Sequence, residues 1–308
     1  MTIRQPNNWL AALALLLPLT SACLGQVTGS PVDHKLAQLR AAVEKRPEDA
    51  AAWRELGRHY YAWHRPDEAV KAWRESLRLE PGQAKLHWSI GTVYSDKDAA
   101  AAKAEYRAAL AIDPDHGGSL LNLGNLYRHE GRFEDAERLL ARAAKNDVSD
   151  SWSLGQLYAD QGRWEEAEAA FVRSVGYEGW GLFGIATLHA DLGRARAKLG
   201  RDTEAIAALE TALEAYRSLG DHYWPLDDVC WNAGDRGPSS AWNAADSREM
   251  AELLYLQARL IARSGDPQGA LESLRGAVER LPELREAARR EADLKAVLPL
   301  LDDLMPRR

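Results

Sequence analysis

The sequence lacks the short motifs that identify common enzyme classes. It contains no HExxH zinc signature, no CxxC pair, no P-loop and no G-x-S-x-G nucleophile motif. The eight histidines are scattered along the chain. Asp221, His222 and Cys230 crowd one segment, but no motif there would orient a nucleophile. We therefore expect no catalytic residue, no metal site and no cofactor.

Runs of β-branched residues are also absent, and Ala, Leu, Glu and Arg dominate. This composition favours helices and gives only a weak strand signal. The formal net charge is −7, which argues against nucleic acid as the main partner. The composition therefore favours an all-α protein with another kind of partner.

What the chain does contain is a glycine that recurs with the same neighbours. Trp53-x2-Leu56-Gly57-x2-Tyr60 is followed by Ala69, Trp73 and Pro81. The short core of this pattern returns three times, as Ile90-Gly91-x2-Tyr94, Leu123-Gly124-x2-Tyr127 and Leu154-Gly155-x2-Tyr158. The four glycines are 34, 33 and 31 residues apart. A period of about 34 residues predicts one supersecondary unit that is stacked repeatedly.

Each position in the pattern has a physical reason. Trp53, Leu56 and Tyr60 recur at spacings of three and four, so they share one face of a helix. Gly57 lies in that stripe without a side chain, which lets a second helix approach closely, at a cost of about 1 kcal/mol relative to alanine. The chain resembles the tetratricopeptide repeat family, which implies antiparallel helix pairs in a right-handed superhelical solenoid.

The pattern divides the chain as follows. Two weaker copies surround Gly193 and Ala258, which are 65 residues apart, so an insertion must lie between them. We expect an all-α solenoid of about six pairs with these parts: a signal peptide at 1–22, a linker at 23–34, a capping half-repeat at 35–49, repeats 1–5 at 50–219, a Trp-rich insertion at 220–247, repeat 6 at 248–283 and C-terminal capping helices at 284–308.

The N-terminus resembles a bacterial lipoprotein signal. Residues 9–19 form an apolar run too short to span a bilayer, and Ser21 and Ala22 precede Cys23. Thr20 departs from the family pattern, which most often has Leu there, and an ordinary cleaved signal peptide is the alternative. The resemblance implies that Cys23 carries acyl chains such as palmitate. Leu24 rather than Asp follows the cysteine, which implies an outer-membrane location facing the periplasm.

Cys230 would then have no partner for an intramolecular disulfide. It is either a buried thiol, or the site of an intermolecular disulfide or a reactive thiol.

In this repeat family, ligands usually bind to the face lined by the first helix of each pair. Counting from the repeat glycines assigns to this groove Arg54, Arg58, Tyr61, Lys85, Trp88, Asn125, Arg128, His129, Trp152, Gln156, Arg194, Lys198, Tyr255, Arg259 and Arg263, with Asp96, Asp160 and Glu252 as its acidic members. We expect exposed side chains that bind an acidic or C-terminal peptide segment. The pattern partly resembles the carboxylate clamps of heat-shock co-chaperones, whose Asn residues it does not reproduce. A solvated helix face is the alternative.

The insertion is the second candidate site. It holds Trp224, Trp231 and Trp242 among Pro and Gly residues that favour an irregular loop. These aromatics either fill the gap between two poorly stacked repeats or fold over the groove to bind a partner.

Taken together, these features favour a membrane-anchored scaffold that binds extended peptide segments of envelope proteins and assists their assembly. The architecture resembles that of pilotin-type lipoproteins of type IV pilus assembly, and of other scaffolds for cell-wall or outer-membrane assembly. A repeat domain carrying a catalytic or ligand-binding insertion at 220–247 is the alternative function.

We predict that Cys23→Ala releases the protein from the membrane fraction. Each buried CH₂ group contributes about 0.8 kcal/mol, so several acyl chains anchor a protein durably. Fractionation and intact-mass measurement check this. Unchanged fractionation together with no lipid mass on Cys23 would contradict it.

Overall fold

The described residues form helices joined by turns, with no strand among them. The structure is a computed structural model, and it describes residues 31–221 and 239–305. The chain forms two compact units, Met1–Leu86 and His87–Arg308. No helix in the described ranges is both long and apolar enough to cross a membrane. Because the described elements are all helices, the all-α prediction is confirmed.

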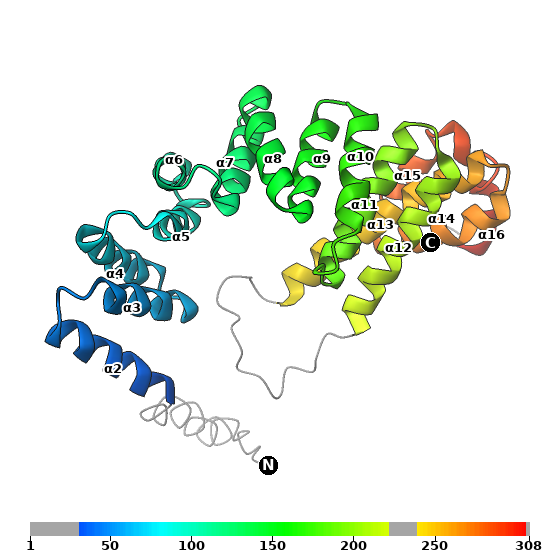
Figure 1. Cartoon of the computed structure of the whole chain (residues 1–308). Coiled ribbons are helices and arrows are strands. Elements are labelled where there is room, and N and C mark those ends of the chain that lie inside the picture. The colour runs from blue at the N-terminus through cyan, green and yellow to red at the C-terminus, as the bar shows by residue number, and fades with distance from the viewer. Residues whose placement is uncertain (1–30, 222–238, 306–308) are drawn as a thin grey trace, which may run out of the picture. The chain divides into compact units, whose positions relative to one another are not determined.

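The helices follow one another as pairs joined by short turns (Figure 1). Unit 1 contains α2 (Pro31–Lys45), α3 (Ala50–Ala62), α4 (Pro66–Leu79) and the start of α5 (Ala84–Tyr94). Unit 2 contains the rest of α5 and then α6 (Ala99–Ile112), α7 (Gly117–His129), α8 (Phe133–Asn146), η1 (Val148–Asp150), α9 (Ser151–Asp160), α10 (Trp164–Val175), α11 (Leu182–Lys198), α12 (Asp202–Asp221), α13 (Ser239–Arg263), α14 (Pro267–Arg280), α15 (Leu284–Ala288), η2 (Ala292–Leu294) and α16 (Leu298–Leu304).

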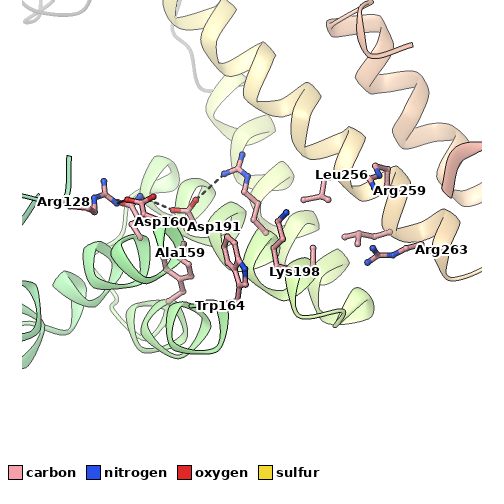
Figure 2. Close-up of a pocket in the computed structure, with 14 residues that line it drawn as sticks. Arg128, Ala159, Asp160, Trp164, Asp191, Lys198, Leu256, Arg259 and Arg263 are labelled. Carbon is pink, nitrogen blue, oxygen red and sulfur yellow. Dashed lines mark hydrogen bonds and ion pairs between the residues drawn. The ribbon is translucent and has the colours of Figure 1, made fainter. Parts of the chain in front are cut away.

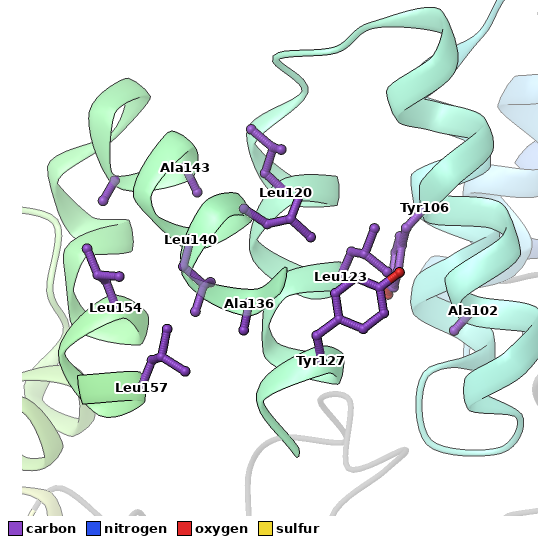
Figure 3. Packing of buried hydrophobic residues seen from close by; sticks show 12 residues of the cluster. Ala102, Tyr106, Leu120, Leu123, Tyr127, Ala136, Leu140, Ala143, Leu154 and Leu157 are labelled. Atoms are coloured by element: carbon purple, nitrogen blue, oxygen red, sulfur yellow. The ribbon is translucent and has the colours of Figure 1, made fainter. Parts of the chain in front are cut away.

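The repeat glycine is the contact point of each pair. A Cβ built on Gly124 of α7 would lie 2.7 Å from Cγ of Leu140 on α8, and one on Gly155 of α9 would lie 2.6 Å from the Phe171 ring on α10. Gly57, Gly91 and Gly193 face Trp73, Tyr106 and Leu209 in the same way. The predicted close approach at these glycines is confirmed. Figure 3 shows how the buried side chains of consecutive pairs then form a continuous core.

The turns within the pairs also follow from local chemistry. Gly131, Gly162, Gly200 and Gly265 have φ between 72° and 88°, the left-handed region that favours glycine at the end of a helix. His64 takes this role in the first pair, with φ of 53°. An arginine directly follows the turn residue at positions 64, 131 and 162, and each of these arginines lies over a tyrosine of the first helix. Arg132, for example, is 4.1 Å from the Tyr127 ring centroid and donates to Asp135.

The last helices cover the end of unit 2. Leu294, Val297 and Leu301 are buried against Leu274 and Val278 of α14. Terminal units of a repeat array need such a cover, because their apolar face has no further repeat to pack against.

Part of the expected insertion is helical. Residues 222–238, with Trp224, Cys230 and Trp231, lie outside the described residues, as do Cys23 and the N-terminal segment. α13 begins at Ser239, so residues 239–247 extend this helix, although the side chain of Trp242 is not described. The 25-residue α13 lines more than one cavity of unit 2.

We predict that Gly124→Leu lowers the free energy of unfolding by roughly 1–3 kcal/mol, because the new side chain would overlap Leu140. Gly117→Ala on the same helix is the matched control, since no atom lies within 4 Å of the place that its Cβ would take. Urea denaturation of both variants checks this. Equal stability of the Gly124→Leu variant and the wild-type protein would show that this contact is unimportant.

Candidate functional site

The first helices of four consecutive pairs in unit 2 line one cavity of about 540 Å³. Its polar residues lie at regular distances along the sequence from the small residue of each repeat, which is Gly155, Gly193 or Ala258. Arg194 and Lys198 lie one and five positions after Gly193, and Arg259 and Arg263 lie one and five positions after Ala258. Positions four apart share a helix face. Gln156 and Asp160 take the same two places after Gly155, so the repeat itself builds the polar rim of the cavity.

Below the rim lies an apolar floor. It is formed by Phe171, Leu256 and Leu260, with Ala159 and Ala197 between them. Figure 2 shows Lys198 between Asp191 on one side and Leu256 and Arg259 on the other. The cavity thus combines apolar area with charged groups at its edge, as is typical of binding sites.

Asp191 on α11 is the centre of the polar network. Its carboxylate accepts hydrogen bonds from Nε1 of Trp152 at 2.8 Å, from Nε2 of Gln156 at 3.2 Å and from Nη1 of Arg194 at 3.3 Å. Oε1 of Gln156 in turn accepts from Arg128 at 3.0 Å. The network therefore links α7, α9 and α11 through charge-assisted bonds, which are the stronger kind.

The arginines of the cavity are paired with carboxylates of the chain itself. Arg259 contacts Glu291 at 2.8 Å and Asp293 at 3.1 Å, and Arg263 donates to Asp202 at 2.9 Å. Arg194 pairs with Glu249 as well as with Asp191. Burial opposes the charge on Arg194, but these two carboxylates outweigh it and raise its pKa. A count of charges along the first helices predicts a strongly positive cavity. These ion pairs neutralise most of that charge.

Lys198 is different. Within the described ranges it is the only cation lining this cavity that has no carboxylate partner. Its side chain is exposed, and Nζ lies 5.9 Å from the centroid of the Trp164 ring on α10. Lys198 is therefore free to bind an anionic group of a ligand.

Arg128 differs from the expectation of an exposed groove residue. Its side chain is only 12% exposed, it contacts Asp160 at 3.6 Å, and its Nε is buried without a hydrogen-bond partner. The neighbouring pair closes over this side chain, so Arg128 supports the wall of the cavity more than it offers a free charge.

Trp152 borders a second, adjacent cavity of about 420 Å³ that shares Gln156, Asp191 and Arg194 with the first. Its ring packs edge-on against Trp180, with centroids 5.7 Å apart. The indole N–H is already bonded to Asp191, so Trp152 offers a ligand mainly apolar surface.

The remaining predicted groove residues do not line the main cavity. Trp88, Asn125 and Tyr255 are half-buried, and each has one buried polar atom without a partner. Burial raises the pKa of the Tyr255 hydroxyl.

Three groove residues that belong to unit 1 make contacts within that unit. Arg54 donates to Gln83 at 2.7 Å, Arg58 pairs with Glu55 at 2.9 Å, and Tyr61 packs on Trp73. Lys85 is an exposed residue of α5. None of these four residues is among those that line the cavity in unit 2.

Sequence reasoning missed Asp191, Trp164 and the apolar floor. Asp191 stands two positions before Gly193, and its spacing of three from Arg194 is the only local signal for it. Asp202, Glu249 and Asp293 come from other segments and have no such signal. Their contribution depends on how the pairs stack.

The fold and the cavity together define a class of protein, a helical-repeat scaffold for protein–protein interaction. Residues 36–84, 64–117 and 153–220 match one description of the tetratricopeptide repeat, and residues 93–153 match another. These matches cover more than half of the chain, and the protein belongs to the tetratricopeptide repeat family.

Two curated relatives are named for a cellulose synthase operon and for type IV pilus assembly. Cellulose synthase operon protein C of Xanthomonas axonopodis pv. citri is 28% identical over 236 residues, which is 74% of this chain and 14% of that protein. Type IV pilus assembly protein PilF of Pseudomonas aeruginosa is 28% identical over 104 residues, 33% of this chain and 41% of PilF. The sequence matches thus span less than half of either relative.

Solved structures share the fold. A structure of P. aeruginosa PilF has a TM-score of 0.54 at 18% identity, and the similarity covers 82% of this chain and 97% of PilF. The pilus biogenesis factor PilW gives a TM-score of 0.53 at 18% identity, covering 81% and 98% of the two chains. At these identities the similarity establishes the fold alone.

We predict that Asp191→Asn lowers the free energy of unfolding by about 1–2 kcal/mol, because three donors lose a charged acceptor. Asp160→Asn is the control. The half-exposed Asp160 side chain makes one ion pair, a long one of 3.6 Å with Arg128. Its substitution should therefore lower the free energy of unfolding by no more than about 0.5 kcal/mol. Urea midpoints of the two variants check the difference, and equal losses would show that Asp191 is not the centre of the network.

Proposed function

We propose that this protein is an envelope scaffold that binds an extended peptide segment of a partner protein in the cavity around Lys198. The observation that carries the proposal is Lys198, which has no carboxylate partner in the described part of the chain and lies beside an apolar floor. Both features are supplied mainly by first helices of the repeat. The names of the relatives, a pilus assembly protein and a cellulose synthase operon protein, support an envelope setting.

The arrangement suits a peptide that presents a carboxylate next to an apolar side chain. Lys198 would bind the carboxylate, and the side chain would lie against Trp164 and Leu256. The paired arginines would act differently, because a ligand anion must compete with their own carboxylates. They hold the four first helices in position, so the cavity is formed before the ligand arrives and less ordering entropy is lost on binding.

The anchoring is part of the proposal. Acyl chains on Cys23 would hold the scaffold at the outer membrane with the repeats in the periplasm, and segments of envelope proteins would be captured there for assembly. The resemblance of residues 19–23 to a lipoprotein signal supports this location.

The test uses a partner segment identified by crosslinking in envelope fractions and then made as a synthetic peptide. We predict that Lys198→Glu weakens its binding roughly tenfold at low salt, because an attraction becomes a repulsion. The effect should shrink at 1 M salt, where the Debye length is about 3 Å. Lys145→Glu is the matched control, since it makes the same charge change on an exposed position of the second helix α8.

Trp164→Ala should weaken binding at both salt concentrations, because the ring contributes apolar contact area rather than charge. Titration by fluorescence anisotropy measures all three variants. If Lys198→Glu binds as tightly as the wild-type protein at low salt, the cavity is not the binding site.

A further inference from the structure

The cavity of about 420 Å³ that Trp152 borders (the Trp152 cavity) lies beside the cavity around Lys198 (the Lys198 cavity). A stripe of α11 runs through both. Thr187, Asp191, Arg194 and Lys198 recur at spacings of four, three and four, so they lie on one face of the helix. Thr187 lines only the Trp152 cavity, Lys198 lines only the Lys198 cavity, and the two residues between them line both. One ligand lying along α11 would therefore reach both cavities.

The Trp152 cavity is built partly by helices that extend beyond the usual length of the repeat. α11 begins 11 residues before Gly193, whereas α3, α5 and α7 each begin seven residues before their glycine. α12 has 20 residues, whereas the second helices α4, α6, α8 and α14 have 14. α13 has 25 residues. The lining residues Phe183, Tyr216 and Glu249 all lie in these added turns.

The cavity presents aromatic rings to a ligand. Phe183, in the added turn of α11, is 43% exposed. Trp152 of α9 is half-buried, and its indole N–H is already bonded to Asp191 at 2.8 Å, so the ring offers carbon surface. Tyr216 of α12 adds a third ring to the lining. The aromatic lining therefore comes from three different helices.

Trp152 is held in one orientation before any ligand arrives. Its ring packs edge-on against Trp180, with centroids 5.7 Å apart. Trp180 is fixed in turn, because its Nε1 donates to the carbonyl oxygen of Ser174 at 2.8 Å. A Cβ on Gly184 of α11 would lie 2.5 Å from the Trp180 ring, so the missing side chain makes room for this ring. A site that is already ordered loses less entropy on binding.

The polar groups of the Trp152 cavity have partners within the chain. Thr187 donates to the carbonyl oxygen of Phe183 at 2.9 Å, and Glu249 pairs with Arg194. Asp191 accepts hydrogen bonds from three neighbouring side chains. A polar ligand group would lose its water here without meeting an unpaired charge, whereas an apolar group gains from burial of its surface. The lining therefore selects a large apolar side chain, and its rings favour an aromatic one.

The two ends of the α11 stripe thus differ in what they bind. Lys198, at one end, has no carboxylate partner in the described part of the chain and suits an anion. Thr187 marks the aromatic end, 11 residues away, which is about 16 Å along the helix. An extended peptide advances about 3.3 Å per residue, so about four to six residues span this distance.

We propose that the Trp152 cavity is a second subsite, which binds an aromatic side chain of the same peptide that places a carboxylate on Lys198. The aromatic residue lies about four to six residues from the acidic one. The inference rests on the function proposed for the Lys198 cavity and adds a second requirement to the partner. The buried ring slows dissociation, whereas the attraction to Lys198 chiefly speeds association.

A library of random peptides displayed on phage tests the two subsites separately, with peptides of about 12 residues so that one peptide can span both cavities. The library is selected on the full-length wild-type protein, on Lys198→Glu and on Phe183→Ser. For the wild-type protein we expect enriched sequences that combine an acidic and an aromatic residue at the stated separation. Lys198→Glu should remove only the acidic preference, and Phe183→Ser should remove only the aromatic preference.

Val172→Ser is the matched control. Val172 is exposed to a similar degree, 48%, but it lies on α10 and lines neither cavity. This variant should select the same sequences as the wild-type protein.

Titration of the most enriched peptide by fluorescence anisotropy measures the size of the effect. Phe183→Ser should weaken binding about tenfold at low salt and at 1 M salt alike, because the lost contact is apolar. Alanine in place of the aromatic residue of the peptide should weaken binding to the wild-type protein equally. It should cause little further loss with Phe183→Ser, since both changes remove the same contact. If Phe183→Ser does not fold, Thr187→Trp tests the subsite by filling the cavity, with the same expected loss.

The outcomes separate this inference from the function on which it rests. If Lys198→Glu removes the acidic preference but Phe183→Ser leaves the aromatic preference unchanged, the subsite is wrong and the proposed function stands. Selection of Lys or Arg in place of an aromatic residue would also overturn the subsite, because the carboxylates would then choose the ligand. An absence of enriched sequences would overturn both proposals. An aromatic preference that appears only after Trp224 and Trp231 are replaced by alanine would overturn the subsite as a site for a partner.

Discussion

The close approach of two helices at a residue without a side chain is the contact on which the rest of the structure depends. Gly124 lets Leu140 rest on the backbone of α7, and Gly155 lets Phe171 rest on that of α9. This contact sets the rotation of each first helix about its own axis. Once that rotation is set, positions one and five after the glycine, or after Ala258 in α13, face the same side in each pair. The cavity is therefore a consequence of packing at the glycines.

Stacking of the pairs decides the electrostatics. Asp191 is 35 residues from Gln156, and Asp202 is 61 residues from Arg263, yet each pair is hydrogen-bonded. These carboxylates neutralise arginines that a charge count along single helices assigns to a positive surface. The paired charges hold the helices together, whereas an unpaired charge remains free for a ligand. Lys198 is therefore a better candidate for binding an anionic ligand than the arginines of the cavity.

α13 shows how one helix can carry two surfaces. One side of it follows the repeat and completes the Lys198 cavity. The other carries Gln257 where all five earlier pairs have a buried apolar residue. The carbonyl oxygen of Gln257 accepts a hydrogen bond from the buried Ser273 hydroxyl of α14, so a polar contact joins the two helices of this pair. The two sides differ in chemistry: one presents a cation beside apolar side chains, and the other forms a buried polar contact with α14.

The sequence by itself determined the helix pairs, because glycine spacing, apolar periodicity and turn glycines are local signals. It also placed Gln156, Arg194, Lys198 and Arg259 on one face, since that face follows from the repeat register. It could not determine that Arg128 is nearly buried, that Asp191 joins three helices or that most arginines are neutralised. These facts depend on side chains from different pairs coming within hydrogen-bond distance, and only the stacking of the repeats in three dimensions decides which residues meet.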